Sequence, residues 1–203
     1  MPKITLVLDP CLITVYLLLH HADFFEFFDI PVDNLYAAPL FVRDIKERYG
    51  DRDLMIVSPD VGGVVRARQL AQRLNTDLAI IDKRRERAGV SEVMNVIGDV
   101  KGRHCLLVDD IVDSGGSLCN AAQAIFNNGA ASVGAYVTHG VLTGSAVERI
   151  SNSCIEMLTL TDSIKATESV KAAANIRQIT IAGLLARAMR AVSDESSVSS
   201  LFD

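Results

Sequence analysis

Residues 105–117 read Cys-Leu-Leu-Val-Asp-Asp-Ile-Val-Asp-Ser-Gly-Gly-Ser. The apolar run over residues 105–108 predicts a buried strand, which delivers Asp109 and Asp110 to its C-terminal end, where open α/β sheets bind ligands. A third acid, Asp113, comes before a pair of glycines that permit a tight turn. A helix is expected to follow, and the free N–H groups at its start attract phosphate. The stretch therefore predicts a strand–turn–helix unit with a ligand site at the sheet edge.

The ligand that fits this stretch carries both a phosphate and hydroxyl groups. Carboxylates repel phosphate, so the acids are expected to hold neutral hydroxyls or a metal ion, while the glycine turn receives the phosphate. The alternative is an ordinary strand–helix loop with turn glycines and a capping serine. Three acids within five positions are costly to hold together without a cation or hydroxyl partner. This cost favours a phosphosugar site.

Strands and helices alternate from residue 54 onward. This alternation predicts an α/β fold with a mostly parallel sheet flanked by helices. Apolar runs predict strands over residues 54–58, 78–81, 93–97, 105–108, 133–137 and 155–160. Helical spacing predicts helices near residues 64–74, 118–126, 145–150 and 181–192. The polar tail over residues 193–203 is expected to be loose, apart from Leu201 and Phe202.

The start of the chain differs in composition, because five of the first 30 residues are Phe or Tyr. We predict that residues 1–34 are an irregular start or the remnant of another domain, and that residues 35–203 form the α/β domain. The apolar run over residues 4–19 is interrupted by Asp9-Pro10 and is shorter than the roughly 20 residues of a membrane helix. A signal peptide also fits poorly. Neither a membrane span nor export is expected.

Composition narrows the function classes. The net charge of −5 and the absence of Trp argue against a general nucleic-acid binder and against base-stacking platforms. The four cysteines are widely spaced, with no Cys-x-x-Cys pair. This spacing predicts reduced thiols in a cytoplasmic protein rather than a disulfide scaffold or a zinc site.

Other polar clusters also follow predicted strands. Asp60 and the glycines at 62–63 suit either phosphate or metal-phosphate binding or simple helix capping by the acid. Residues 138–145 suit a second anion loop or a capped strand–helix loop. The pair His20-His21 is a weaker signal, because adjacent histidines seldom point the same way, and two ordinary histidines are the alternative.

Four cations follow the strand predicted over residues 78–81. Such a run is usually a solvated surface loop. Next to the flexible Ala88-Gly89, it also suits a loop that closes over a polyphosphate and neutralises its charge. The four are Lys83, Arg84, Arg85 and Arg87.

Together these motifs resemble one family, the ribose-phosphate pyrophosphokinases. The resemblance is carried by residues 27–34, 57–60, 62–68, 80–85 and 108–110, within a stretch from residue 27 to 203. It implies a phosphoribosyltransferase-type fold and transfer of a diphosphate from ATP to the 1-hydroxyl of ribose 5-phosphate, which yields AMP and 5-phosphoribosyl 1-diphosphate. Positioning, Mg²⁺ and cations would carry such a transfer.

The resemblance assigns roles to positions of this chain. Asp109 and Asp110 would hold the ribose hydroxyls, Lys83 and Arg85 would stabilise the transferring group, and His21 and Asp60 would be Mg²⁺ ligands. The loop around the 5-phosphate would comprise Asp113, Ser114, Gly115, Gly116 and Ser117.

The resemblance covers only the C-terminal portion of the family, without most segments that hold the adenine. Three hypotheses therefore stay open: an active enzyme completed by another chain, a non-catalytic phosphosugar-binding or regulatory subunit that joins a full-length homologue, and a base phosphoribosyltransferase. The third would need a hood that recognises the base, and the Lys83 and Asp60 motifs favour the synthetase over it. If all four were exposed, Phe24, Phe25, Phe27 and Phe28 would form an apolar patch that calls for a partner; the alternative is that half of them are core. A homo-oligomer or association with a homologous subunit is expected, because a fold without the family's first domain leaves an interface uncovered.

Overall fold

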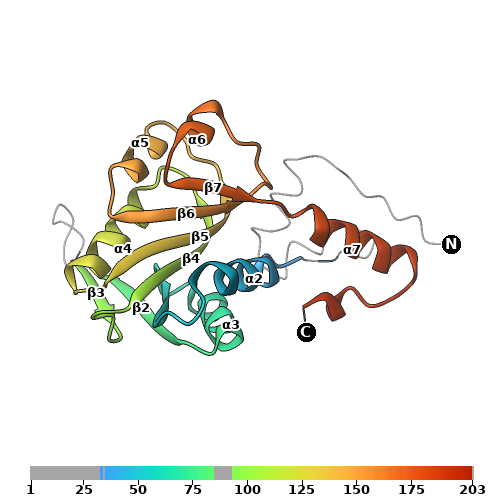
Figure 1. The fold of residues 1–203 in the computed structure, drawn as a ribbon, viewed down its shortest axis with the longest axis horizontal. Helices are drawn as coiled ribbons and strands as arrows, with labels where there is room; N and C mark the ends of the chain where they lie inside the picture. The colour runs from blue at the N-terminus through green and yellow to red at the C-terminus, as the bar shows by residue number, and fades with distance from the viewer. Residues whose placement is uncertain (1–32, 34, 85–92, 203) are drawn as a thin grey trace.

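The computed structural model describes residues 33, 35–84 and 93–202 and confirms an α/β fold (Figure 1). Its sheet comprises β1 (Leu54–Ser58), β2 (Asp77–Arg84), β3 (Val93–Ile97), β4 (His104–Val112), β5 (Ser132–Gly140), β6 (Ile155–Thr161) and β7 (Ile176–Ile179). Its helices are α2 (Ala38–Tyr49), α3 (Val64–Leu74), α4 (Gly116–Asn127), α5 (Ala146–Ser151), α6 (Glu168–Ala172), α7 (Ala182–Ser193) and the 3₁₀ turn η2 (Ser199–Leu201).

The strand order has its switch point at β1 and β4, and the crevice of such a sheet lies outside the carboxyl ends of these two strands. The order across the sheet is β3-β2-β1-β4-β5-β6-β7, and each neighbouring pair is parallel except β2 with β3. From β1 the chain moves to β2 on one side, whereas from β4 it moves to β5 on the other. Ligands of open α/β sheets bind where the order reverses in this way. A ligand-binding site is therefore expected at the carboxyl ends of β1 and β4.

Helices cover both faces of the sheet, as expected. Figure 1 shows α2 and α3 on one side and α4, α5 and α6 on the other, while α7 extends past β7. The core under α2 and α3 includes Ile56, Leu70 and Tyr136, and the core under α4 includes Ile125 and Leu158. Burial of these apolar side chains is the main stabilising contribution to the fold.

Several strands run further than their apolar stretches predict. Backbone pairing between β4 and β5 continues to Val112 opposite Gly140, so Asp109 and Asp110 lie inside β4 rather than after it. Likewise, Thr138 and His139 belong to β5. Polar side chains can stay in a strand at its carboxyl end, because one strand neighbour still satisfies the backbone groups.

The structure differs from the predicted secondary structure and burial in further places. Helices α2 and α6 and strand β7 were not predicted. The helical spacing also predicts Val65 and Phe126 on the apolar faces of their helices, but both side chains are exposed. The Phe202 ring lies 5.4 Å from the Tyr36 ring in an edge-to-face contact, which agrees with its expected exception from the loose tail. Val198 is buried as well, so more of the tail packs against the domain than expected.

A half-buried ion pair ties α2 to the sheet. Asp44 on α2 accepts hydrogen bonds from both terminal nitrogens of Arg177 on β7, with Nη1 at 3.0 Å. The Tyr136 hydroxyl on β5 donates to Asp44 Oδ2 at 2.6 Å. Burial alone would raise the pKa of Asp44, but the hydrogen bonds from Arg177 and Tyr136 lower it below its usual value. This cluster joins three elements that are distant in sequence.

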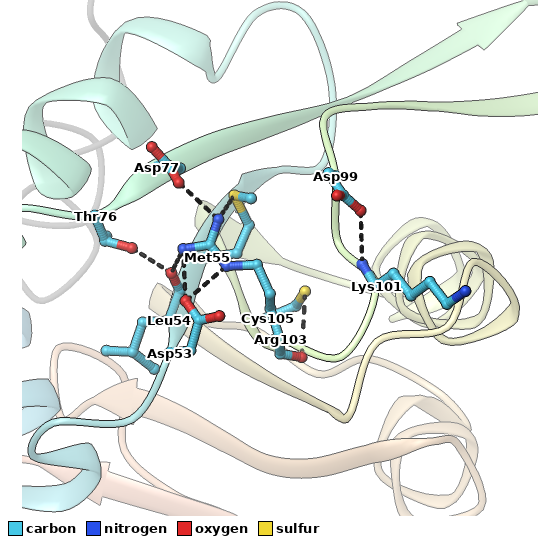
Figure 2. Close-up of polar contacts among 9 residues, drawn as sticks. All are labelled: Asp53, Leu54, Met55, Thr76, Asp77, Asp99, Lys101, Arg103 and Cys105. Carbon is cyan, nitrogen blue, oxygen red and sulfur yellow. Dashed lines mark hydrogen bonds and ion pairs between the residues drawn. The ribbon is translucent and has the colours of Figure 1, made fainter.

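A second charged cluster closes the amino ends of the strands, opposite the crevice (Figure 2). Arg103 reaches Asp53 Oδ1 from Nε at 2.8 Å, Asp77 Oδ2 from Nη1 at 2.7 Å and the Leu54 carbonyl oxygen from Nη2 at 2.6 Å. The two carboxylates are largely exposed. Ion pairs of this kind contribute little individually, so the cluster serves mainly to fix the starts of β1, β2 and β4.

The predictions about cysteines, membrane spans and the start of the chain can be compared with the structure only over the described residues. Among the described residues, Cys105, Cys119 and Cys154 are free thiols, and the reduced state of the protein stays a prediction. No helix in residues 35–84 or 93–202 is long and apolar enough to cross a membrane. His21, Cys11 and the phenylalanines at 24–28 lie outside the described residues. The domain boundary at residue 34 stays a prediction.

Candidate functional site

The acid pair, Asp109 and Asp110, lies half-buried near the carboxyl end of β4. Asp109 Oδ1 accepts a hydrogen bond from the Asp110 backbone N–H at 2.9 Å. Burial, followed by the neighbouring charge of Asp110, raises the pKa of Asp109 to about 7. A carboxyl group with this pKa exchanges between donor and acceptor forms near neutrality, and both forms can bind a hydroxyl.

Arg66 neutralises the acid pair, and sequence reasoning missed it. It lies in the first turn of α3, where its Nη1 is 2.8 Å from Asp110 Oδ2 and its Nη2 is 3.9 Å from Asp109 Oδ1. Its Nε is buried and has no hydrogen-bond partner within the described residues. The signals available were its place three residues after Gly63, at the start of a predicted helix, and its membership of the 62–68 stretch that carries the resemblance, to which no role was assigned.

The turn over residues 58–63 joins β1 to α3 on the other side of the crevice. Asp60 Oδ1 accepts from the Gly63 N–H at 2.9 Å, and the Ser58 hydroxyl donates to the Asp60 carbonyl oxygen at 2.7 Å. Asp60 thus stabilises the turn that precedes α3, but it is not the N-cap that the capping alternative predicts, because the N-cap is Gly63 and no side chain caps this helix. Its charge also contributes to the raised pKa of Asp109, so the turn and the acid pair share one electrostatic environment.

A metal ion would find few protein ligands here. Within the described residues, no group of three or more His, Cys, Asp or Glu side chains forms a ready-made metal site. Mg²⁺ usually binds one or two carboxylates and completes its octahedron with water and substrate phosphates. Asp60 and the acid pair fit that limited role.

The 113–117 loop begins α4 and has a form that suits an anion. Gly115 adopts φ +73°, and a Cβ there would lie 3.3 Å from Ile150. Of the two glycines that permit a tight turn, only Gly115 has a positive φ. No side chain caps α4, so its first N–H groups point to the loop, as phosphate binding requires.

The segment after β5 supports this loop. The Thr143 hydroxyl donates to Asp113 Oδ1 at 2.6 Å, and the Thr143 N–H donates to the Asp113 carbonyl oxygen at 3.1 Å. Arg149 on α5 donates to the Ser114 carbonyl oxygen. Residues 138–145 had two interpretations, and these contacts favour a supporting strand–helix loop over a second anion loop.

Two other polar residues, His139 and Lys83, lie near the carboxyl ends of β5 and β2. His139 is fully buried, its Nδ1 lies 2.8 Å from the Ser163 hydroxyl, and burial lowers its pKa to about 4. It is therefore uncharged at neutral pH. Lys83 is half-buried near the end of β2, opposite Met94 of β3. Arg85 and Arg87 lie outside the described residues.

The strand order and this crevice define a phosphoribosyltransferase-type domain. Residues 32–175 match the family model of the phosphoribosyl transferase domain, and the chain belongs to that family. It is also a homologue of ribose-phosphate pyrophosphokinases, as the motifs of the sequence had indicated.

The similarity to these relatives is high but covers only part of their length. The chain is 73% identical over 185 residues to the ribose-phosphate pyrophosphokinase of Granulibacter bethesdensis. It is 61% identical over 185 residues to that of Rhizobium meliloti. Each match covers 91% of this chain and 60% of the relative. The solved phosphoribosylpyrophosphate synthetase of Mycobacterium smegmatis superposes with a TM-score of 0.79 at 36% identity, over 87% of this chain and 57% of that one. The chain thus spans about 60% of the length of the curated relatives it matches.

Proposed function

We propose that this crevice binds ribose 5-phosphate and 5-phosphoribosyl 1-diphosphate, and that the chain supplies the phosphoribosyl half of a ribose-phosphate diphosphokinase. The overall reaction would transfer the diphosphate of ATP to the 1-hydroxyl of ribose 5-phosphate and release AMP. One observation carries the proposal: β4 leads from the acid pair directly into an uncapped helix start at the sheet's switch point, beside the 58–63 turn.

Each part of the crevice has a role in this proposal. The acid pair accepts the ribose hydroxyls, and the 113–117 loop holds the 5-phosphate with backbone N–H groups and the hydroxyls of Ser114 and Ser117. The 58–63 turn lies where the diphosphate must reach C1, and Asp60, together with His21, would help to hold Mg²⁺. When bound, Mg²⁺ would neutralise charge on the phosphates. Lys83 and Arg85 would stabilise the transferring group.

A second candidate function is a non-catalytic subunit that binds the same phosphosugar and joins a full-length homologue. The observation in its favour is the 60% coverage of the relatives, since ATP must be held by groups beyond the crevice. Both candidates imply a cytoplasmic protein that forms a homo-oligomer or associates with a homologous subunit, without nucleic acid or membrane.

The first test combines calorimetric binding of ribose 5-phosphate with AMP release from ATP and ribose 5-phosphate in Mg²⁺, using the purified chain. Binding with AMP release is the result expected of the diphosphokinase, and binding without AMP release supports the second candidate. Absence of ribose 5-phosphate binding would contradict both.

A matched pair of glycine variants locates that binding. Gly115 and Gly102 have nearly the same φ, +73° and +75°, but only Gly115 lies in the 113–117 loop, and nothing lies within 4 Å of a Cβ at Gly102. Gly115→Ala should lower the affinity for ribose 5-phosphate at least tenfold, whereas Gly102→Ala should keep it. Equal affinities in the two variants would exclude this loop.

We also expect Thr143 to matter without touching the ligand. Thr143→Val removes the hydroxyl that orients Asp113 through a charge-assisted hydrogen bond. The substitution should therefore weaken ribose 5-phosphate binding about fivefold, or roughly 1 kcal/mol. Thr143→Ser keeps the hydroxyl and should bind like the wild type. Titration calorimetry on the two variants gives the comparison, and similar affinities for Val and Ser would show that the hydroxyl has no such role.

A further inference from the structure

The crevice brings three carboxylates close to the place proposed for a diphosphate. Asp60 belongs to the 58–63 turn, and its charge acts on Asp109 of the acid pair. A diphosphate bound between the turn and the ribose would be repelled by all three. A cation at the junction between the turn and the acid pair would offset this repulsion, in addition to any metal ion.

Arg66 occupies that junction. Its guanidinium lies 2.8 Å from Asp110 and 3.9 Å from Asp109. The nitrogen nearest Asp109, Nη2, is also 3.8 Å from the position that a Cβ would take on Gly63. The same guanidinium thus borders both the acid pair and the 58–63 turn.

Arg66 also has capacity for another partner. Its hydrogen bond to Asp110 uses one terminal nitrogen, and its buried Nε has no partner within the described residues. A small cavity of about 50 Å³ lies beside it; Arg66, Asp109, Asp110 and Thr138 line one part, and the rest of the lining is mostly apolar and includes Phe41 of α2. The fork of N–H donors on arginine matches the oxygens of a phosphate group.

We propose that Arg66 is a binding residue for the diphosphate group, and that it allows this anion to lie beside the acid pair. This inference rests on the proposed function. Arg66 neutralises Asp109 and Asp110 when the diphosphate is absent and presents N–H donors to it when 5-phosphoribosyl 1-diphosphate is bound. Ribose 5-phosphate, which has no group at this place, depends on Arg66 much less.

The experiment compares two ligands on four proteins by titration calorimetry in Mg²⁺. The proteins are the wild type, Arg66→Gln, Arg66→Lys and Arg68→Gln, the last being a control because Arg68 is exposed on the same helix. We expect Arg66→Gln to lower affinity for 5-phosphoribosyl 1-diphosphate at least tenfold and affinity for ribose 5-phosphate less than threefold. Arg66→Lys should restore part of the loss, and Arg68→Gln should match the wild type for both ligands.

The ratio of the two affinities separates a ligand contact from a structural role, because a general disturbance of the crevice would weaken both ligands together. Equal losses for the two ligands, or no loss, would overturn the assignment of Arg66 while leaving the proposed function in place. If Arg66→Gln does not fold, the ratio of the two affinities is measured on Arg66→Lys instead. A larger loss of affinity for 5-phosphoribosyl 1-diphosphate than for ribose 5-phosphate would then support the assignment. If the wild type binds neither ligand, both the proposed function and this inference fail.

Discussion

Replacing Asp109 by Asn is expected to lower the affinity for ribose 5-phosphate about 100-fold, equivalent to roughly 2.7 kcal/mol. The amide removes a charged acceptor from the half-buried acid pair, and hydrogen bonds to charged groups are the stronger ones. Titration calorimetry measures this loss. Asp99→Asn, far from the crevice in an exposed turn where Asp99 accepts from the Lys101 N–H at 3.2 Å, should retain wild-type affinity.

The same substitution should make the protein more stable at neutral and alkaline pH. Burial and Asp110 raise the pKa of Asp109 from 3.8 to about 7 in the folded state, so the folded protein binds a proton that the unfolded chain has released. This contribution to stability is fully present below about pH 4, falls as the pH rises, and is lost above pH 7. Asp109→Asn has no such loss.

The difference should appear in urea unfolding at pH 5 and pH 8. The free energy of unfolding of Asp109→Asn should exceed that of the wild type by about 2 kcal/mol at pH 8, and by less at pH 5. Wild-type affinity together with a stability difference that does not grow with pH would contradict the role of Asp109.

The second large effect concerns stability alone. Asp44→Ala should destabilise the protein by about 3–4 kcal/mol, because it leaves the Arg177 guanidinium half-buried and unpaired. Arg177 Nε already lacks a partner within the described residues, so little else there can replace the carboxylate. Chemical denaturation at neutral pH gives the value.

Two controls separate this ion pair from ordinary surface effects. Glu47→Ala breaks the exposed pair between Arg43 and Glu47 on the same helix, 4.0 Å apart, and should cost less than about 0.5 kcal/mol. Tyr136→Phe removes only the hydroxyl that donates to Asp44 and should cost about 1 kcal/mol. A loss below 1 kcal/mol for Asp44→Ala would mean that the cluster is not a main anchor of α2.

The sequence predicted most of the sheet, because buried parallel strands are continuous apolar runs, such as residues 54–58. It did not predict where β4 and β5 end, since pairing between neighbouring backbones extends both strands through polar residues. Helix α2 was missed although its Leu40, Phe41 and Ile45 are buried. It lies just after the compositional break, where no alternation had yet been established.

Only part of the candidate site could be predicted from the sequence. The acid pair and the 113–117 loop are continuous in sequence, so their chemistry is visible as a motif. Arg66 is 44 residues from Asp110, and an arginine on a helix is ordinarily a solvated residue. Thr143 is 30 residues from Asp113. Contacts of this kind arise from the order of strands, which a linear pattern does not contain.

The contact between Tyr36 and Phe202 has a mechanical consequence. Leu35 packs with Leu201 and Phe202, and Leu40 of α2 packs with Leu184 of α7, so the two limits of the described domain meet at one place on its surface. A stretching force applied between them would peel the tail and α7 away from α2 first. The parallel strands would bear no load until these apolar contacts between α2, α7 and the tail had separated.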